Sequence, residues 1–270
     1  MSLMFCRQEN ASHPFYVDVL GINIYTSQEL CYVIYHHPLL VMEDFVDDNL
    51  IDFIRDELNM AYLASRLEKW RKTEENQDEL AVIILQECFY YRTSEVNDFR
   101  QHLINLRKKH IAEFTKEKAD YLFELKQYGR AVPVYEKCLE YPRDNVANDE
   151  FFGKIWCNMG SAYARMFQWE KALKAFEKAY YYLKDMSVVQ KMYYMTLMNS
   201  KLELKEKYKN LITDELKVKW DEEMKEAKGK AALSEEVRKV ERMFETDPLQ
   251  RMDRAMAMVR QWKQEYRNMI

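Results

Sequence analysis

The chain has 270 residues, of which 48% are apolar and 32% are charged, so it can bury one large or two small hydrophobic cores. Its formal net charge of −4 argues against binding to nucleic acid through a generally basic surface. Five Gly and five Pro are few for this length, and their scarcity favours long helices joined by short turns.

The cysteines predict reduced thiols and not a disulfide framework or a zinc site. They show no CxxC or zinc-ligand spacing and lie far apart, at Cys6, Cys31, Cys88, Cys138 and Cys157. Reduced thiols suit a reducing compartment, so we expect a cytoplasmic protein. We also expect no signal peptide and no membrane-spanning helix, because charged residues follow closely on the N-terminus and no apolar run reaches about 18 residues.

The first 25 residues differ from the rest of the chain. Residues 15–25 are rich in β-branched and aromatic side chains and are interrupted by Gly21, which predicts an extended arm or a short β-hairpin. Helices are expected from Thr26 onward, because Thr26-Ser-Gln-Glu29 has the sequence of a capping box. The helix that it opens should stop before Pro38.

An acidic stretch follows, between Glu43 and Glu57. Its carboxylates have two interpretations, a solvated helix face or a docking face for a basic partner. The apolar residues within and just after the stretch stand at helical spacing, at Leu50, Phe53, Ile54 and Leu58. Further helices are expected at 60–70 and 80–91, and another after a cap at Thr93 or Ser94.

Residues 151–185 carry the strongest pattern in the chain. Apolar and small side chains recur at i, i+3, i+4 and i+7 and then, after a short turn, at i, i+4 and i+7. The two sets are Trp156, Met159, Gly160 and Tyr163, followed by Ala172, Phe176 and Ala179. The spacing predicts two helices packed as a hairpin, which cannot bury so much apolar surface alone.

These residues resemble a tetratricopeptide repeat, at about 153–186. That family places Trp, Leu, Gly and Tyr on the first helix and Ala, Phe and Ala on the second, and Met159 stands here for the Leu. A more degenerate repeat is expected at about 112–141, with Tyr128, Ala131 and Tyr135 in the matching positions. A third first helix is expected after a capping box at residues 187–190.

The resemblance implies an all-α fold, a helical-hairpin α-solenoid with an N-terminal helical domain preceded by a short β-like arm. We expect the domains to span residues 1–110, 111–207 and 208–270. The last contains helices at 214–228, 234–244 and 248–266 that cap the solenoid, the third starting at Asp247-Pro248. An apolar stripe on that third helix is a candidate homodimer interface, at Met252, Ala255, Met256, Val259 and Trp262.

The resemblance also implies a binding groove along the first helices of the repeats. Its polar positions are Lys116, Lys154, Asn158, Ser161 and Arg165. Some family members hold the C-terminal carboxylate of a partner with Lys and Asn residues from two repeats. Lys116 and Asn158 fit two such positions, but Asp120 stands where a second Asn is expected and would repel a carboxylate.

We expect a non-enzymatic adaptor that binds a protein or peptide partner. No catalytic or metal-ligand motif stands out among the five histidines and the carboxylates, so neither a cofactor nor a metal is expected. Three alternatives remain open: a peptide-sensing regulatory protein, an RNA-binding helical-repeat protein, and an enzyme with an unfamiliar site. An RNA-binding protein requires a basic, aromatic groove, which the net charge disfavours.

Overall fold

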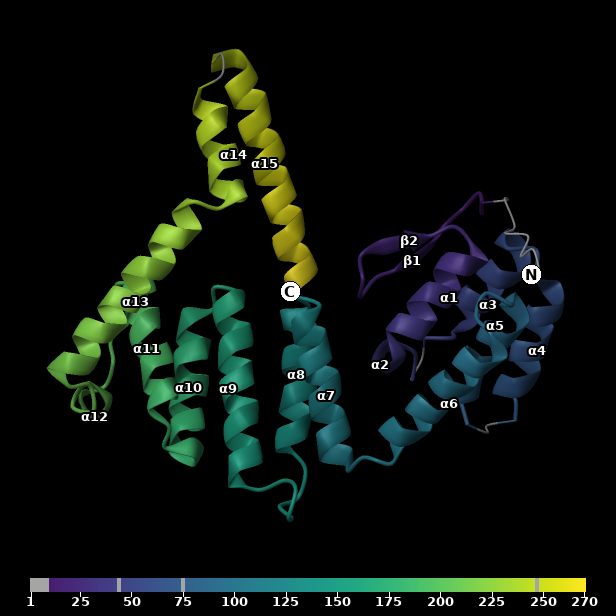
Figure 1. Cartoon of the computed structure of the whole chain (residues 1–270), viewed down its shortest axis with the longest axis horizontal. Coiled ribbons are helices and arrows are strands. Elements are labelled where there is room, and N and C mark those ends of the chain that lie inside the picture. Colours follow the sequence, from purple (N-terminus) through teal and green to yellow (C-terminus); the bar gives the residue numbers. More distant parts are fainter. Residues whose placement is uncertain (1–9, 43–44, 74–75, 246–247) are drawn as a thin grey trace. The chain divides into compact units, whose positions relative to one another are not determined.

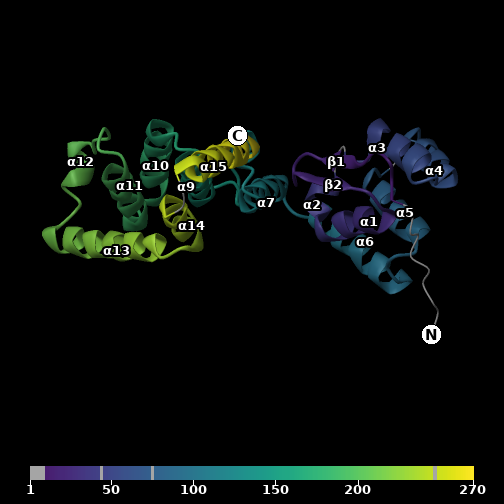
Figure 2. The same ribbon diagram turned by 90° about the horizontal axis from the view of Figure 1, so that it is seen from above.

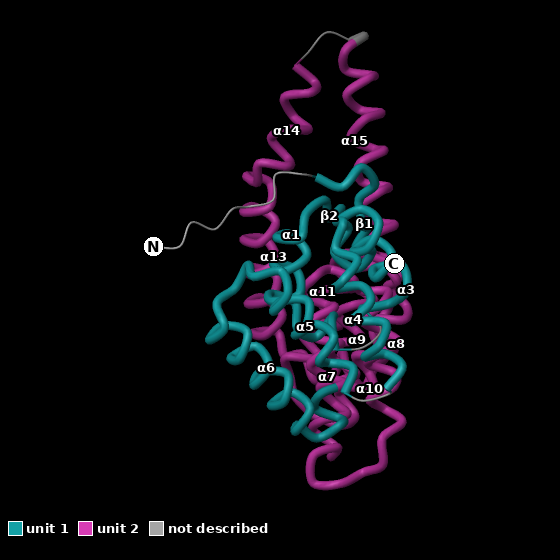
Figure 3. The backbone as a smooth tube through the Cα atoms, turned by 90° about the vertical axis from the view of Figure 1, so that its right-hand side faces the viewer, with its two compact units in different colours: residues 1–114 teal, residues 115–270 magenta. Residues whose placement is uncertain are grey.

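The computed structural model describes residues 10–42, 45–73, 76–245 and 248–270. The chain forms two compact units, Met1–Phe114 and Thr115–Ile270 (Figure 3). In the described part the secondary structure is helical apart from one two-stranded sheet (Figure 1). The all-α prediction with a short N-terminal β arm is therefore confirmed, and the three domain limits expected from the sequence stay a prediction.

The arm is a β-hairpin at the start of the first unit. Strands β1 (Phe15–Val17) and β2 (Ile22–Ile24) pair antiparallel, with Val17 opposite Ile22. Gly21 ends the turn with a φ of +66°, a backbone conformation that glycine adopts without strain. Val17 and Ile24 are 5% and 1% exposed, so one face of the hairpin packs against the helices and stabilises it.

The helices of the first unit surround an apolar core. They are α1 (Ser27–His36), α2 (Pro38–Val41), α3 (Asp48–Asp52), the π-helix η1 (Phe53–Glu57), α4 (Ala61–Arg71), α5 (Asp78–Cys88) and α6 (Thr93–Arg107). The expected capping box opens α1, where Glu29 N–H donates to Thr26 Oγ1 at 3.2 Å and Thr26 N–H donates to Glu29 Oε2 at 3.1 Å. As expected, α1 ends before Pro38.

Two helix ends in the first unit differ from the sequence prediction. Helix α5 stops at Cys88 and does not reach Tyr91, because Phe89 adopts a left-handed φ of +52°. Helix α6 is capped at Arg92 instead of Thr93 or Ser94, and the Arg92 N–H donates to Glu95 Oε2 at 2.8 Å. The end of α5 thus moves by three residues because of the backbone at Phe89, while the cap of α6 moves by one or two because the Glu95 side chain accepts from the Arg92 N–H.

An ion pair between an exposed arginine and a buried carboxylate holds α5 and α6 together. Asp78 is 3% exposed, and the Arg107 guanidinium donates to its two carboxylate oxygens at 2.7 and 2.8 Å. Arg107 also donates to the Met42 carbonyl oxygen. A buried carboxylate with a bidentate arginine partner is fully hydrogen-bonded and locks the register of the two helices.

Five helices of the second unit stand side by side (Figure 1). They are α7 (Ile111–Glu124), α8 (Tyr128–Leu139), α9 (Asp149–Arg165), α10 (Trp169–Leu183) and α11 (Met186–Met198). The turns within the two hairpins are alike. Lys126 and Phe167 have φ of 61° and 59°. In each turn the N–H of the next residue donates to the carbonyl oxygen five positions earlier, Gln127 to Leu122 and Gln168 to Tyr163, both at 2.9 Å.

The first turn of α11 corrects one detail of the sequence analysis. Asp185 is the capping residue and not Ser187, because its Oδ1 accepts from the Ser187 N–H at 2.8 Å and its Oδ2 accepts from the Ser187 hydroxyl at 2.7 Å. These hydrogen bonds lower the pKa of the Asp185 carboxyl. The ionised cap also interacts favourably with the N-terminal end of the helix dipole.

The remaining helices extend from α11 and return to the repeats. They are α12 (Glu206–Lys209), α13 (Asp214–Ala232), α14 (Glu235–Phe244) and α15 (Pro248–Met269). Helix α13 lies beside α11 (Figure 2). Trp220 of α13 is 4% exposed, and its ring centroid lies 5.7 Å from that of Tyr193 on α11. Helices α14 and α15 form a hairpin, and the Tyr266 hydroxyl donates to the Met166 carbonyl oxygen at 3.3 Å. The cap expected at Asp247 lies outside the described residues.

Candidate functional site

A polar cluster connects the first helices of the two hairpins. Asp120 of α7 forms an ion pair with Lys116, one turn away on the same helix. Its Oδ1 accepts from the amide Nδ2 of Asn158 on α9 at 2.8 Å and from the hydroxyl of Tyr135 on α8 at 2.6 Å. The two clamp positions anticipated from the sequence, Lys116 and Asn158, are therefore joined by a carboxylate of the chain itself.

The environment of this cluster keeps Tyr135 neutral. The residue is 0% exposed, and burial, with the adjacent Asp120 carboxylate, raises the pKa of the Tyr135 phenol well above its usual range. A neutral phenol donates its proton to a carboxylate, so the Tyr135–Asp120 contact is a hydrogen bond to a charged acceptor. Lys116, Asn158 and Tyr135 together leave the Asp120 carboxylate well compensated.

A pocket of about 560 Å³ opens between α9, the end of α10 and the start of α11. It is lined by Glu150, Lys154, Cys157, Asn158, Tyr182, Leu183, Asp185, Ser187, Val188 and Lys191. Its charges are mixed in sign, and its apolar side chains come mainly from α10 and α11. A pocket of this size and composition accommodates a short peptide segment with both apolar and polar side chains.

The charged side chains of the pocket are already engaged within the protein. Lys154 forms an ion pair with Glu150 at 2.6 Å, and it lowers the pKa of that carboxyl. Lys191 Nζ lies 3.1 Å from Cys157 Sγ and donates to it. Both contacts are exposed to solvent, so they do not hold these side chains rigidly.

The five predicted groove residues thus divide into three groups. Lys154 and Asn158 line the pocket, while Lys116 reaches Asn158 only through Asp120. Ser161 donates to the Cys157 carbonyl oxygen of its own helix at 3.0 Å, and Arg165 is exposed in the last turn of α9. Their assignment to partner binding stays a prediction.

Sequence reasoning missed the contribution of α11. Lys191 and Val188 line the pocket beside α9, but the third repeat carries none of the residues that allow alignment with the other two. The signal that the sequence analysis used for the start of α11, an apparent capping box at residues 187–190, lies two residues beyond the actual cap at Asp185. The register of α11 against α9 follows from packing, with Val188, Val189 and Met192 at 0–1% exposed.

The repeat signature residues lie between α9 and α10. Met159, Ala172, Phe176 and Ala179 are 0–3% exposed, while Trp156 and Tyr163 are half-buried at the edge of the same core. Gly160 is needed at its position, because a Cβ there would lie 2.7 Å from ring carbons of Phe176. Small residues on one helix admit large ones from the other, as the hairpin pattern predicts.

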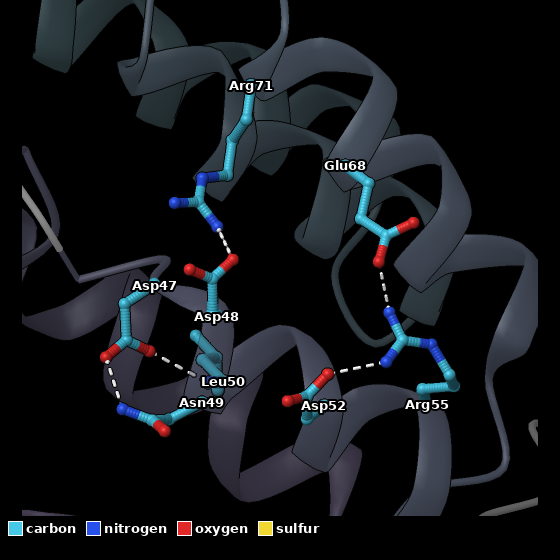
Figure 4. A network of polar contacts seen from close by, with 8 residues as sticks. All are labelled: Asp47, Asp48, Asn49, Leu50, Asp52, Arg55, Glu68 and Arg71. Atoms are coloured by element: carbon cyan, nitrogen blue, oxygen red, sulfur yellow. Dashed lines mark hydrogen bonds and ion pairs between the residues drawn. The ribbon is translucent and has the colours of Figure 1, made fainter.

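The acidic stretch of the first unit is largely compensated within that unit (Figure 4). Arg71 pairs with Asp48, and Arg55 bridges Asp52 and Glu68. Asp47 caps α3, its Oδ1 accepting from the Leu50 N–H at 2.8 Å. Glu43 and Asp44, which begin the stretch, lie outside the described residues. The paired carboxylates favour the solvated-face interpretation over a docking face for a basic partner.

The described part of the chain holds no metal site, no membrane-spanning helix and no disulfide. In that part of the chain no group of three or more His, Cys, Asp or Glu side chains is placed to hold a metal ion. None of the described helices is both long and apolar enough to cross a membrane. Cys31, Cys88, Cys138 and Cys157 form no disulfide, and Cys6 lies outside the described residues.

The comparisons with known proteins bear on the repeats. No curated protein matches the chain significantly. One solved structure, described as "MamA RS-1 ArsTM double mutant", aligns over 64% of this chain and 84% of its own, with 21% identity and a TM-score of 0.29. At this TM-score the likeness says nothing about arrangement or function.

The tetratricopeptide repeat family model matches residues 117–145 and 153–182. The two matches cover the α7–α8 and α9–α10 hairpins, which share the turn geometry at Lys126 and Phe167. The resemblance predicted from the sequence is therefore confirmed for both the well-matched and the degenerate repeat. The chain contains two tetratricopeptide repeats, one built from α7 and α8 and the other from α9 and α10.

Proposed function

We propose that the protein is a non-enzymatic adaptor that holds a segment of a protein partner in the pocket between α9 and α11. The observation that carries the proposal is the pocket itself, where Lys154 and Asn158 of a tetratricopeptide hairpin face Lys191 of the next helix. Repeats of this type commonly mediate contacts between proteins. Their stacked helices offer an extended surface for a peptide, and no step of chemistry is required.

The partner segment is proposed to be internal and not a chain terminus. A terminal carboxylate needs uncompensated donors, and Asp120 already occupies Lys116 and Asn158. The pocket carries both signs of charge and apolar side chains. An extended segment with one apolar anchor and mixed polar neighbours is complementary to it.

The test is affinity capture from the source cell followed by mass spectrometry. Wild type is compared with Asn158→Ala combined with Arg165→Glu, which changes the groove, and with Asn210→Ala combined with Arg242→Glu. The second pair is matched in chemistry but lies on exposed positions of other elements. The proposal requires a protein retained by wild type and the control and lost by the groove variant.

Other outcomes of the same capture contradict either the proposed binding site or the adaptor itself. A protein retained equally by all three chains places its contact outside the groove. Nucleic acid retained in a salt-sensitive way favours the RNA-binding alternative. Circular dichroism of each variant establishes that the helices remain, so that loss of a partner reports on the groove and not on unfolding.

We also propose a homodimer through α15, because its apolar stripe stays largely exposed in the part of the chain that the structure describes. Met252, Met256, Val259 and Trp262 are 65%, 41%, 41% and 51% exposed. Four large apolar side chains on one helix face are typical of an interface. Light scattering measures the molecular mass of the intact chain and of a chain without residues 248–270. Met256→Glu is the point variant, and Val218→Glu, at an exposed position of α13, is its control. A mass that is monomeric in the intact chain overturns the homodimer.

A further inference from the structure

A second hollow in the repeat unit lies apart from the groove. It has a volume of about 440 Å³ and is formed by the end of α10, by α12 and by the loop that follows. We call it the lysine–tyrosine hollow and define it by Lys178, Tyr180, Tyr181, Lys184, Lys207 and Tyr208. None of the five predicted groove residues lines it.

The hollow carries a local positive charge in a chain whose net charge is −4. Lys178, Lys184 and Lys207 are exposed, and none of them has an ion-pair partner among the residues that the structure describes. The one carboxylate of the lining, Glu177, is neutralised by Lys205 at 2.5 Å. Three ammonium groups around one depression attract an anionic ligand.

Aromatic rings hold these ammonium groups in place. Lys178 Nζ lies 4.0 Å from the centroid of the Trp156 ring, and Lys207 Nζ lies 4.7 Å from that of Tyr208. Lys184 Nζ lies over two rings, 5.0 Å from Tyr181 and 5.5 Å from Tyr180. Each contact has the geometry of a cation–π interaction, which positions a flexible lysine without neutralising it.

The floor of the hollow is apolar. Tyr208 is 3% exposed, its ring meets the Tyr180 ring edge-on at 5.6 Å, and Leu211 completes the lining. This combination of an apolar floor and a cationic rim suits an apolar side chain with carboxylates on either side of it.

We propose that the lysine–tyrosine hollow binds a short acidic segment of a protein, in which Asp or Glu residues flank one apolar or aromatic anchor. Nucleic acid fits the geometry less well. Bases stack on open ring faces, whereas the rings of Tyr180, Tyr181 and Tyr208 already face lysine ammonium groups. A longer polyanion would also meet the net negative charge of the rest of the chain.

The experiment measures fluorescence anisotropy of labelled peptides with the full chain. The probe is acetyl-Glu-Glu-Phe-Glu-Glu-amide, compared with the same peptide carrying Ala as anchor and with a twelve-residue oligouridylate. The hollow variant is Lys184→Gln combined with Lys207→Gln. The control variant, Lys174→Gln combined with Lys217→Gln, removes the same charge from exposed lysines of α10 and α13 that do not line the hollow.

The expected result is saturable binding of the Phe peptide that is weakened about tenfold or more in the hollow variant and unchanged in the control. The Ala peptide should bind more weakly, and raising NaCl from about 50 mM to about 500 mM should reduce affinity several-fold. The proposal is overturned by equal affinity for both variants, by tighter binding of the oligonucleotide, or by no binding at about 1 mM peptide.

The result is independent of the groove. The groove variant, Asn158→Ala with Arg165→Glu, should bind the acidic peptide as wild type does, because neither residue lines the hollow. A negative peptide experiment therefore does not contradict the adaptor proposal. A negative affinity capture does not contradict the proposal that the lysine–tyrosine hollow binds an acidic segment.

Discussion

The amide of Asn158 donates to Asp120 at 2.8 Å, and this hydrogen bond joins the first helices of two successive repeats. The same carboxylate oxygen accepts from Tyr135 on the helix between them. One side chain therefore ties three helices together at the position where related repeats bind a partner. Asp120 thereby engages Lys116 and Asn158, the two side chains that the resemblance assigned to a clamp.

Asp120→Ala should destabilise the repeats by about 1–3 kcal/mol, because Tyr135 is left buried without its acceptor. Asn158→Ala should cost less, about 0.5–1.5 kcal/mol, because the Asp120 side chain is 34% exposed and water can replace the deleted amide as a donor. The double variant should show a coupling of about 0.5 kcal/mol or more by urea unfolding. Strictly additive losses would mean that the 2.8 Å contact does not stabilise the fold.

Gly160→Ala should destabilise the chain by about 1–3 kcal/mol, although alanine favours helices, because the new Cβ meets the Phe176 ring. Gly229→Ala is the matched control within another helix. Nothing lies within 4 Å of that Cβ, so helix propensity alone should stabilise it by about 0.5–1 kcal/mol. Urea unfolding of both variants checks the opposite signs, and a stabilising Gly160→Ala would show that α9 and α10 separate readily.

Arg107→Ala should destabilise the first unit by about 1–3 kcal/mol, because it removes the bidentate partner of the buried Asp78 carboxylate from a site where the arginine itself is 46% exposed. Arg55→Ala removes an arginine from a more exposed network with Asp52 and Glu68 and should cost about 1 kcal/mol or less. Thermal unfolding followed by circular dichroism compares the two. Similar losses would contradict the distinction between a buried carboxylate, Asp78, and the exposed carboxylates Asp52 and Glu68.

Alkaline pH should destabilise the second unit through Tyr193. Burial, together with the hydrogen bond from its hydroxyl to Asp221, raises the pKa of Tyr193 to about 12. The unfolded residue ionises near pH 10, so above that pH the unfolded state releases a proton that the folded state keeps. Stability is therefore complete below about pH 10 and falls as pH rises toward 12.

Replacing Tyr193 with Phe should flatten this part of the stability profile. Tyr62→Phe is the control, because that side chain is 75% exposed. The urea midpoints of wild type and of both variants, measured from about pH 8 to about pH 11.5, the range in which phenols titrate, give the difference in their pH dependence of stability. Parallel profiles for wild type and Tyr193→Phe would exclude Tyr193 as a source of the pH dependence.

Gly129→Ala should release the end of α15 from α8. A Cβ at Gly129 would lie 2.1 Å from the backbone oxygen of Ile270, and the backbone cannot move aside as a side chain does. Helix α8 itself should not suffer, since alanine favours helices. Hydrogen exchange should therefore rise in the last turns of α15 and remain unchanged in α8. Equal protection of α15 in both chains would mean that Gly129 does not determine its docking.

Local patterns in the sequence were sufficient for the fold of the repeats. The spacing of Trp156, Gly160 and Phe176 encodes a hairpin because small and large side chains must interdigitate where two helices touch. The capping box at Thr26 encodes the start of α1 for the same local reason, since its hydrogen bonds span only three residues. At residues 15–25, by contrast, the local pattern left an extended arm and a hairpin open, and the pairing of β1 with β2 decided between them.

Only the tertiary structure decided what the polar residues do. Lys116 and Asn158 match binding positions by spacing, yet Asp120 engages both, and that contact joins residues 38 positions apart. The lysine–tyrosine hollow likewise depends on α12 folding back beside α10, which no local pattern in the degenerate third repeat predicts. The pattern of buried and exposed positions is determined by residues that are close in the sequence. The hydrogen-bond partner of a polar group depends on the tertiary packing, because packing decides which distant side chain comes within hydrogen-bonding distance.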